Sequence, residues 1–316
     1  MGQKDIKEKR LIAKDEVFAD IYNNIVFQGE QILDSRTLES LPTESYARRT
    51  DGSWRQGNRD IRKADRHNHQ YRLICGIENQ EACDNTMPVR TMGSDYASYE
   101  EQIRTLQNQN QADGHPAYAK GLHDGQKLAP VVTTVLSFGH GWEGPRSLYE
   151  LLDFPEAYRT QLEKLVPDYR LNLVQVDELP QEVIERLTSD FRLVAEFCVN
   201  RKNPARFRKF LKENTKPIQH PEELLELLGE VTGDRRYQEI AGYIVEKKGE
   251  PITMYSVEDE LEQRGMERGL EQGLERGLAQ GLELVNKMLQ NGEGDRIAEL
   301  TENKEFFQQM CEKYLS

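Results

Sequence analysis

Two acidic residues and two amides cluster around one stretch that the sequence marks as a β-strand. Tyr71–Gln80 is a mainly apolar run that ends in a carboxylate and two amides, which is typical of a strand. Because strand side chains alternate between faces, Glu78 and Gln80 are expected on one face. Asp60 precedes the strand by about one hairpin and can stand beside Glu78. Two carboxylates suit a hard divalent ion such as Mg²⁺, with the Asn79 carbonyl as a further candidate ligand.

This arrangement resembles the PD-(D/E)XK nuclease pattern, with Gln80 at the position where the commonest version has lysine. Over roughly its first two thirds the chain is also similar to the Rpn branch, the recombination-promoting nucleases that are also called PD-(D/E)XK family transposases. The stretches that carry this likeness are Phe18 to Asn23, Phe27 to Gly29, Met87 to Arg90, Tyr96, Tyr99, Gln102-Ile103, Pro130 to Val132 and Trp142 to Leu148.

The resemblance implies an α/β fold with a restriction-endonuclease-like core, in which helices flank a mixed central sheet, and a helical C-terminal extension. It implies a divalent-metal-dependent DNA endonuclease, with Mg²⁺ or another divalent cation held by Asp60 and Glu78. Gln80 is the departure, because an amide carries no positive charge and cannot act as a general base; a neighbouring lysine or arginine would supply that charge. The alternative is a catalytically silent DNA-binding or assembly protein built on a nuclease fold.

The first amphipathic helix, expected over Asp15–Phe27, offers further metal ligands. Val17, Phe18 and Ile21 are among the apolar residues at helical spacing. The resemblance implies that an acidic residue on this helix joins the metal site, with Asp20 the first candidate and Asp15 the second. Asp15 has an alternative role as the helix N-cap.

Nucleic-acid binding would depend on local rather than overall charge. The net charge is −13, which argues against coating nucleic acid by bulk electrostatics. The candidate phosphate-binding residues around the predicted site are Arg59, Arg62, Lys63 and Arg90. The alternative is that these cations make ion pairs with nearby acids.

Cysteine and histidine usage does not indicate a zinc site. The four cysteines are scattered without a C-x-x-C pair, and His67-x-His69 has no partners at zinc-like spacing. No apolar run approaches the ~20 residues of a membrane helix, and the Lys-rich start lacks the apolar block of a signal peptide. We therefore expect a cytoplasmic protein with free thiols and no membrane partner.

Three segments are expected along the chain: the nuclease-like core at 1–180, a helical subdomain at 181–250 and a tail at 251–316. Within the core, Met87–Gln107 is predicted to be a helix whose apolar stripe includes Tyr96 and Tyr99 as core aromatics. Further strands are expected at 130–138 and 171–176.

The tail carries a four-residue repeat in which glycine is followed by an apolar residue, from Gly265-Met266 to Gly281-Leu282. Each glycine costs a helix about 1 kcal/mol relative to alanine, so something must offset the repeat. Small residues at this spacing let two helices approach closely, and a period above 3.6 winds right-handed. We predict a helical segment that makes the protein a homo-oligomer; the alternative is a repeat-expanded tether.

Overall fold

The computed structural model describes residues 9–48, 54–58, 60–68, 70–114, 122–123, 125–139, 141–246 and 251–315. The chain divides into two compact units, Met1–Met254 and Tyr255–Ser316. Within the described part, no helix is both long enough and apolar enough to cross a membrane.

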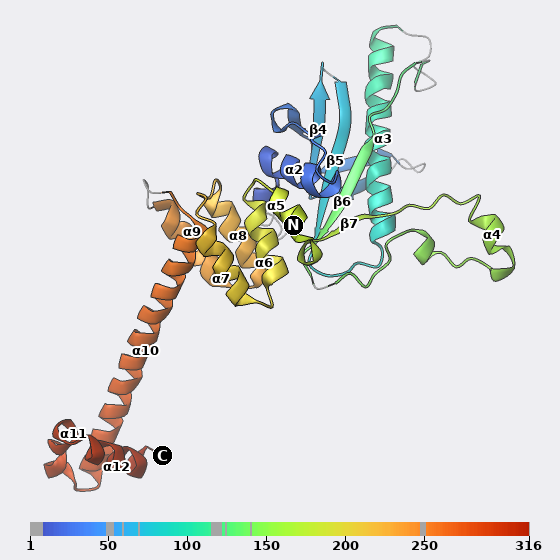
Figure 1. Ribbon diagram of the computed structural model, residues 1–316. Helices are drawn as coiled ribbons and strands as arrows, with labels where there is room; N and C mark the ends of the chain where they lie inside the picture. Colours follow the sequence, from blue (N-terminus) through green and yellow to red (C-terminus); the bar gives the residue numbers. More distant parts are fainter. Residues whose placement is uncertain are drawn as a thin grey trace. The chain divides into compact units, whose positions relative to one another are not determined.

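A five-stranded mixed sheet forms the centre of the first unit (Figure 1). Its strands, in spatial order, are β1 (Leu38–Ser40), β4 (Ile61–His67), β5 (Gln70–Gln80), β6 (Val131–Ser137) and β7 (Asn172–Gln175). The first three strands pair antiparallel, whereas β6 and β7 continue the sheet in parallel with β5. A separate two-stranded sheet, formed by β2 (Glu44–Arg48) and β3 (Trp54–Asn58), interrupts the chain between β1 and β4.

The hairpin between β4 and β5 contains one β-bulge. His67 pairs with Gln70 and Arg66 with Tyr71, but Asp65 then pairs with Leu73. Arg72 is therefore the extra residue on β5, and its guanidinium donates to the buried Asp65 carboxylate at 2.5 Å. All pairs closer to the end of β5 follow the shifted register.

Helices cover both faces of this sheet, as the alternation of side chains requires (Figure 1). The helix α3 (Met87–Ala112) crosses one face, where Glu101 pairs with Arg62 and Asp95 accepts a hydrogen bond from Thr133. The opposite face packs against α2 (Asp15–Ile21), which continues as a π-helix over Tyr22–Val26. The Tyr22 hydroxyl donates to the backbone carbonyls of β5 and β6 at 2.6 and 3.0 Å.

The structure is thus mixed α/β with a helix-flanked mixed sheet, which agrees with the expected fold class at this level. The predicted strands and the helix after β5 are present with small shifts of their ends. The prediction for α3 is wrong for Tyr96, which is 52% exposed, whereas Tyr99 is half-buried and accepts a hydrogen bond from the Val131 amide of β6 at 3.1 Å. Small and polar residues face the sheet instead, among them Ser94, Ala97 and Ser98.

The rest of the first unit, as far as the structure describes it, consists of short helices and the loops between them. The helices are α4 (Arg159–Leu162), α5 (Gln181–Arg186), α6 (Phe191–Asn200), α7 (Pro204–Glu213), α8 (Pro221–Thr232) and α9 (Arg235–Glu246), with 3₁₀ turns at Ser35–Thr37, Tyr149–Leu151, Glu156–Tyr158 and Val176–Glu178. Asn203 caps α7 by accepting from the Arg206 amide. Leu224, Leu225, Leu227 and Leu228 of α8 are buried, so this helix contributes an apolar face to the core.

The second unit contains a long helix and a small helical cap. The helix α10 (Met254–Gln290) begins at the boundary between the units, and it is followed by a 3₁₀ turn at Gly294–Arg296, α11 (Glu299–Glu302) and α12 (Lys304–Tyr314). Leu284, Met288, Phe306 and Met310 form the apolar cluster that joins α10 to α12. The Gly repeat itself lies within α10.

Candidate metal site

The register of β4 and β5 brings Asp60 and Glu78 together. Ile61 pairs with Ile77 as the last pair of the ladder. Asp60 precedes Ile61 and Glu78 follows Ile77, so continuing this register by one position would place Asp60 opposite Glu78. Directly opposed residues of an antiparallel pair share one face of the sheet. The Asn79 backbone N–H donates to the Asp60 carboxylate at 2.7 Å, which fixes that carboxylate at the end of β5.

Each of these two carboxylates has a cation nearby. The Lys9 ammonium is 2.7 Å from Oδ1 of Asp60, and both side chains are mostly buried. Nη2 of Arg90 is 3.8 Å from Oε2 of Glu78, which is 4% exposed. A buried carboxylate without a partner is costly, so these cations offset the cost of burying the two acids.

Arg90 also connects the site to the loop that follows β5. Its Nη1 donates to Asp84 at 2.5 Å. Burial alone lowers the pKa of Arg90, but the hydrogen bond to Asp84 and the charges of Glu78, Asp84 and Asp60 outweigh it and raise the pKa. For Asp84, burial raises the pKa of the carboxyl. The hydrogen bonds from Thr86 and Arg90 lower this pKa by more, so the net shift is downward. The first turn of α3 therefore lies in the field of the acidic pair.

The donor set at this edge fits a magnesium ion with two protein carboxylates. Among the residues that the structure describes, no group of three or more His, Cys, Asp or Glu could hold a metal. Mg²⁺ needs fewer, because it commonly keeps several waters and binds one or two carboxylates. Asp60 and Glu78 would hold it, and Gln80 projects to the same face as Glu78. The Asn79 side chain projects to the other face, so the backbone carbonyl of Asn79 is the candidate ligand.

The structure does not bring the two first-helix acids to this pair. Asp15 pairs with Lys63, whose ammonium lies over the Phe18 ring on the face covered by α2. Asp20 is 7% exposed and accepts hydrogen bonds from the Ser189 amide at 2.8 Å and from Asn24 at 2.7 Å, and also from Thr188. Both acids lie on the opposite face from Glu78 and have structural partners, so we leave them out of the proposed metal site.

The basic residues predicted to contact phosphate divide between buried and exposed positions. Arg62 and Lys63 are each 2% exposed and pair with Glu101 and Asp15. They alternate between the two faces of β4, so neither forms a surface rim. Arg90 has a side chain that is 47% exposed and remains able to contact a phosphate. Arg59 lies outside the described residues.

A row of polar residues extends from the acidic pair along the same edge of the sheet. Gln80 pairs with Ser137, which pairs with Gln175. Since β5, β6 and β7 are parallel, these residues sit at their carboxyl ends, where α/β sheets commonly bind ligands. The exposed Arg146 donates to Gln175 at 3.3 Å, so a cation also stands at the far end of the row.

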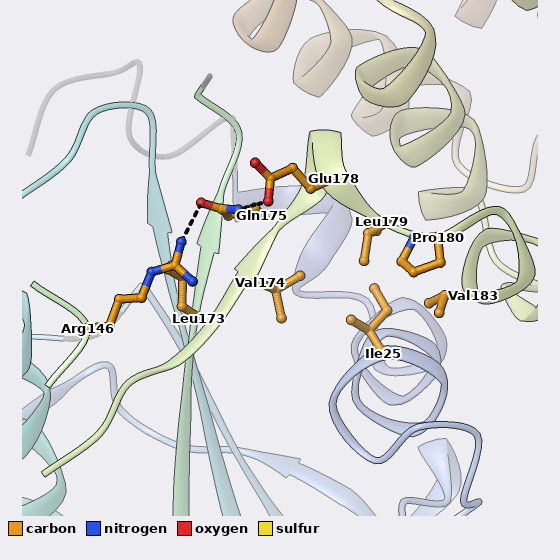
Figure 2. Close-up of a pocket in the computed structure, with 9 residues that line it drawn as sticks. All are labelled: Ile25, Arg146, Leu173, Val174, Gln175, Glu178, Leu179, Pro180 and Val183. Carbon is orange, nitrogen blue, oxygen red and sulfur yellow. Dashed lines mark hydrogen bonds between the residues drawn. The ribbon is translucent and has the colours of Figure 1, made fainter. Parts of the chain in front are cut away.

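A pocket of about 310 Å³ opens beside Gln175 (Figure 2). One side is polar, with Arg146, Gln175 and Glu178 joined by hydrogen bonds. The other side is apolar and is formed by Ile25, Val174, Leu179, Pro180 and Val183. The pocket is thus continuous with the polar row at Gln175.

Sequence reasoning missed Lys9 and Arg146. Lys9 lies in a charged N-terminal stretch that the sequence marks only by the adjacent apolar pair Leu11-Ile12, both buried. That pair anchors a helical turn and so carries Lys9 to Asp60. Arg146 belongs to a motif of the family resemblance, but only the pairing of β6 with β7 shows which residues it meets.

Comparisons with known proteins supply no family for this chain. No protein-family model and no curated protein matches its sequence, and no solved structure matches its fold.

Proposed function

We propose that this chain is a divalent-metal-dependent endodeoxyribonuclease with a PD-(D/E)XK core, similar to the Rpn nucleases. The observation that carries the proposal is the end of the β4–β5 ladder, where Ile61 pairs with Ile77 and the Asp60 carboxylate accepts a hydrogen bond from the Asn79 amide, next in the chain to Glu78. The chain order around this pair supports it: a helix, three antiparallel strands, a second helix and a parallel strand. Three antiparallel strands followed by a crossover helix are also what the expected core requires.

In this proposal Asp60 and Glu78 bind the ion and hold it at the sheet edge. A bound Mg²⁺ would activate a water and stabilise the negative charge that develops on phosphorus. Gln80 would orient the water or a phosphate oxygen by hydrogen bonding. Arg90, with a half-exposed side chain, would contact a non-reacting phosphate of the DNA.

Lys9 would supply the positive charge that Gln80 lacks. Its ammonium lies at hydrogen-bond distance from Asp60, and a lysine beside the metal-binding acid can stabilise developing negative charge. The charge that the common motif places on the strand would here come from the segment before α2. With Lys9 in this role, glutamine at position 80 is compatible with catalysis. We also propose that the protein acts in the cytoplasm.

The experiment is plasmid cleavage in Mg²⁺ by the full chain and two isosteric variants, Glu78→Gln and Asp60→Asn. We expect each variant to lose cleavage by about 100-fold or more, because a charged metal ligand becomes neutral. Glu39→Gln is the matched control, since Glu39 is a half-exposed strand carboxylate paired with Arg66. Thermal unfolding of all four proteins checks that they remain folded. Full cleavage by both site variants would refute the proposal.

A second candidate is a DNA-binding or assembly protein without catalysis. The observation that favours it is that both acids already have cationic partners, Lys9 and Arg90, while Gln80 replaces the usual lysine. Binding of labelled DNA with no cleavage under Mg²⁺ or Mn²⁺, together with no calorimetric signal for either ion, would favour this candidate over the nuclease.

A further inference from the structure

The helix α10 carries an unpartnered apolar face that the proposed nuclease activity does not use. Its five large apolar side chains are 58 to 70% exposed, and each follows a glycine. We name this face the Gly-Leu stripe; it consists of Gly265, Gly269, Gly273, Gly277 and Gly281 with Met266, Leu270, Leu274, Leu278 and Leu282. The stripe is about 26 Å long at 1.5 Å per residue.

The space beside the glycines is open. A Cβ atom added at any of the five would meet no atom within 4 Å outside the adjoining backbone. Within the part of the chain that the structure describes, the glycines therefore serve no contact, although glycine weakens a helix. A row without side chains beside a row of exposed leucines forms a ridge and a groove, and such a surface is complementary to a copy of itself.

The charges beside the stripe have a fixed arrangement. The third position is acidic in four of the five repeats, at Glu267, Glu271, Glu275 and Glu283, and is alanine at Ala279. The position before glycine is basic at Arg264, Arg268 and Arg276 and glutamine at Gln272 and Gln280; Arg264 also pairs with Glu260 of its own helix at 2.9 Å. In the frame of a four-residue repeat, the acids border the leucine side and the arginines border the glycine side. One flank of the stripe is therefore negative and the other is positive.

These flanks select the orientation of a second copy. When two identical helices associate in parallel, each flank meets the opposite flank of its neighbour, as positions e and g do in parallel coiled coils. In an antiparallel pair each flank meets its own kind, so glutamates would face glutamates. Because the repeat advances by more than 3.6 residues, contact along the whole stripe requires a right-handed winding.

We propose that the Gly-Leu stripe is a parallel self-association surface whose partner is a second copy of this chain. Leucines of one copy lie over the glycines of the next, and the arginine flank of each copy pairs with the glutamate flank of its neighbour. This proposal does not depend on the nuclease activity. It predicts association that high salt weakens, because the paired flanks are exposed to solvent.

The first test measures association of the full chain by sedimentation over a range of concentrations. We expect Leu270→Ser with Leu274→Ser to weaken association by 100-fold or more. Leu289→Ser is the matched control, because Leu289 is 55% exposed on the same helix but lies beyond the repeat; it should change association less than threefold. A wild-type chain that stays monomeric at every concentration would overturn the proposal, as would equal effects of the two substitutions.

The second test determines orientation by cross-linking. In a background with Cys83→Ser and Cys311→Ser, the full chain carries either Met266→Cys or Leu282→Cys and is treated with a short bis-maleimide. Parallel copies give covalent dimers with each variant alone. Antiparallel copies link only when the two variants are mixed, and that outcome would overturn the assigned orientation. Unchanged association at high salt would contradict the pairing of the flanks.

Discussion

Replacing Asp20 should unfold the first unit more easily and separate its structural role from metal binding. This carboxylate is buried and accepts hydrogen bonds from the Ser189 amide, the Asn24 side chain and the amide and hydroxyl of Thr188. Asp20→Ala leaves the buried Ser189 N–H without this acceptor, which costs about 2 kcal/mol. Thr188 is exposed and can turn to water, so its bonds and that of Asn24 add about 1 kcal/mol. We expect a total loss of about 3 kcal/mol in the free energy of unfolding.

The assay is urea unfolding followed by tryptophan fluorescence. Both tryptophans, Trp54 and Trp142, belong to the first unit, so the signal reports that unit. Asp20→Asn keeps one carbonyl oxygen and should lose about half as much. Glu30→Ala, an exposed acid close to the same helix, should stay within about 0.5 kcal/mol of the wild type. Unchanged stability of Asp20→Ala with abolished Mg²⁺-dependent cleavage would refute this reasoning and return Asp20 to the metal site.

Three further outcomes can be measured on single-site variants or on the native thiols. Lys9→Met should lower plasmid cleavage about 100-fold while Lys9→Arg keeps part of it, because the cation beside Asp60 stabilises developing charge; equal cleavage by all three proteins would contradict this role. Burial raises the pKa of Cys198 to about 12. Cys198 should resist alkylation at pH 9 while the exposed Cys83 reacts, and its contribution to stability should be present below its unfolded pKa and be lost as the pH rises towards 12; mass mapping of labelled peptides and urea midpoints against pH check both statements. Gly139→Ala should destabilise by about 2 kcal/mol, since its Cβ would lie 2.4 Å from the Glu81 carbonyl oxygen, whereas Gly242→Ala, with open space around it in α9, should be neutral or stabilise by up to about 1 kcal/mol; equal melting temperatures would contradict the predicted clash.

Periodicity predicted the central strand and the face shared by Glu78 and Gln80, because alternation is a local property of the backbone. The run of β-branched residues also located β6, because valine and threonine favour a strand over a helix. The same reasoning failed for Tyr96 of α3, which is exposed, although Tyr99 of the same stripe is half-buried against β6. A helix that lies close on a sheet can bury small residues such as Ala97 and Ser98, and their size rather than their hydropathy decides that contact.

The surroundings of the candidate site could not be predicted, because they depend on contacts between distant segments. Arg62 and Lys63 are neighbours in sequence but meet carboxylates from helices on opposite faces of the sheet. Lys9 reaches Asp60 across about fifty residues of chain, and Asp20 meets a loop near residue 188. The clustering of charged residues in the sequence therefore predicted that charged side chains lie near the site. It did not predict which face each side chain points to or which residue it pairs with.

The bulge at Arg72 sets which residues can cooperate at the distant end of the hairpin. If Arg72 were paired in the ladder instead of bulging, the pairing of His67 with Gln70 would continue unshifted, and Asp60 would stand opposite Ile77, with Glu78 on the other face of the sheet. Deleting Arg72 removes the extra residue itself and leaves Asp65 paired with Leu73, so this variant should keep the two acids together. One residue inserted between Leu73 and Glu78 would instead shift the pairing, whereas equal changes in both strands would preserve it. Which acids meet is therefore set by strand pairing and not by the number of residues between them.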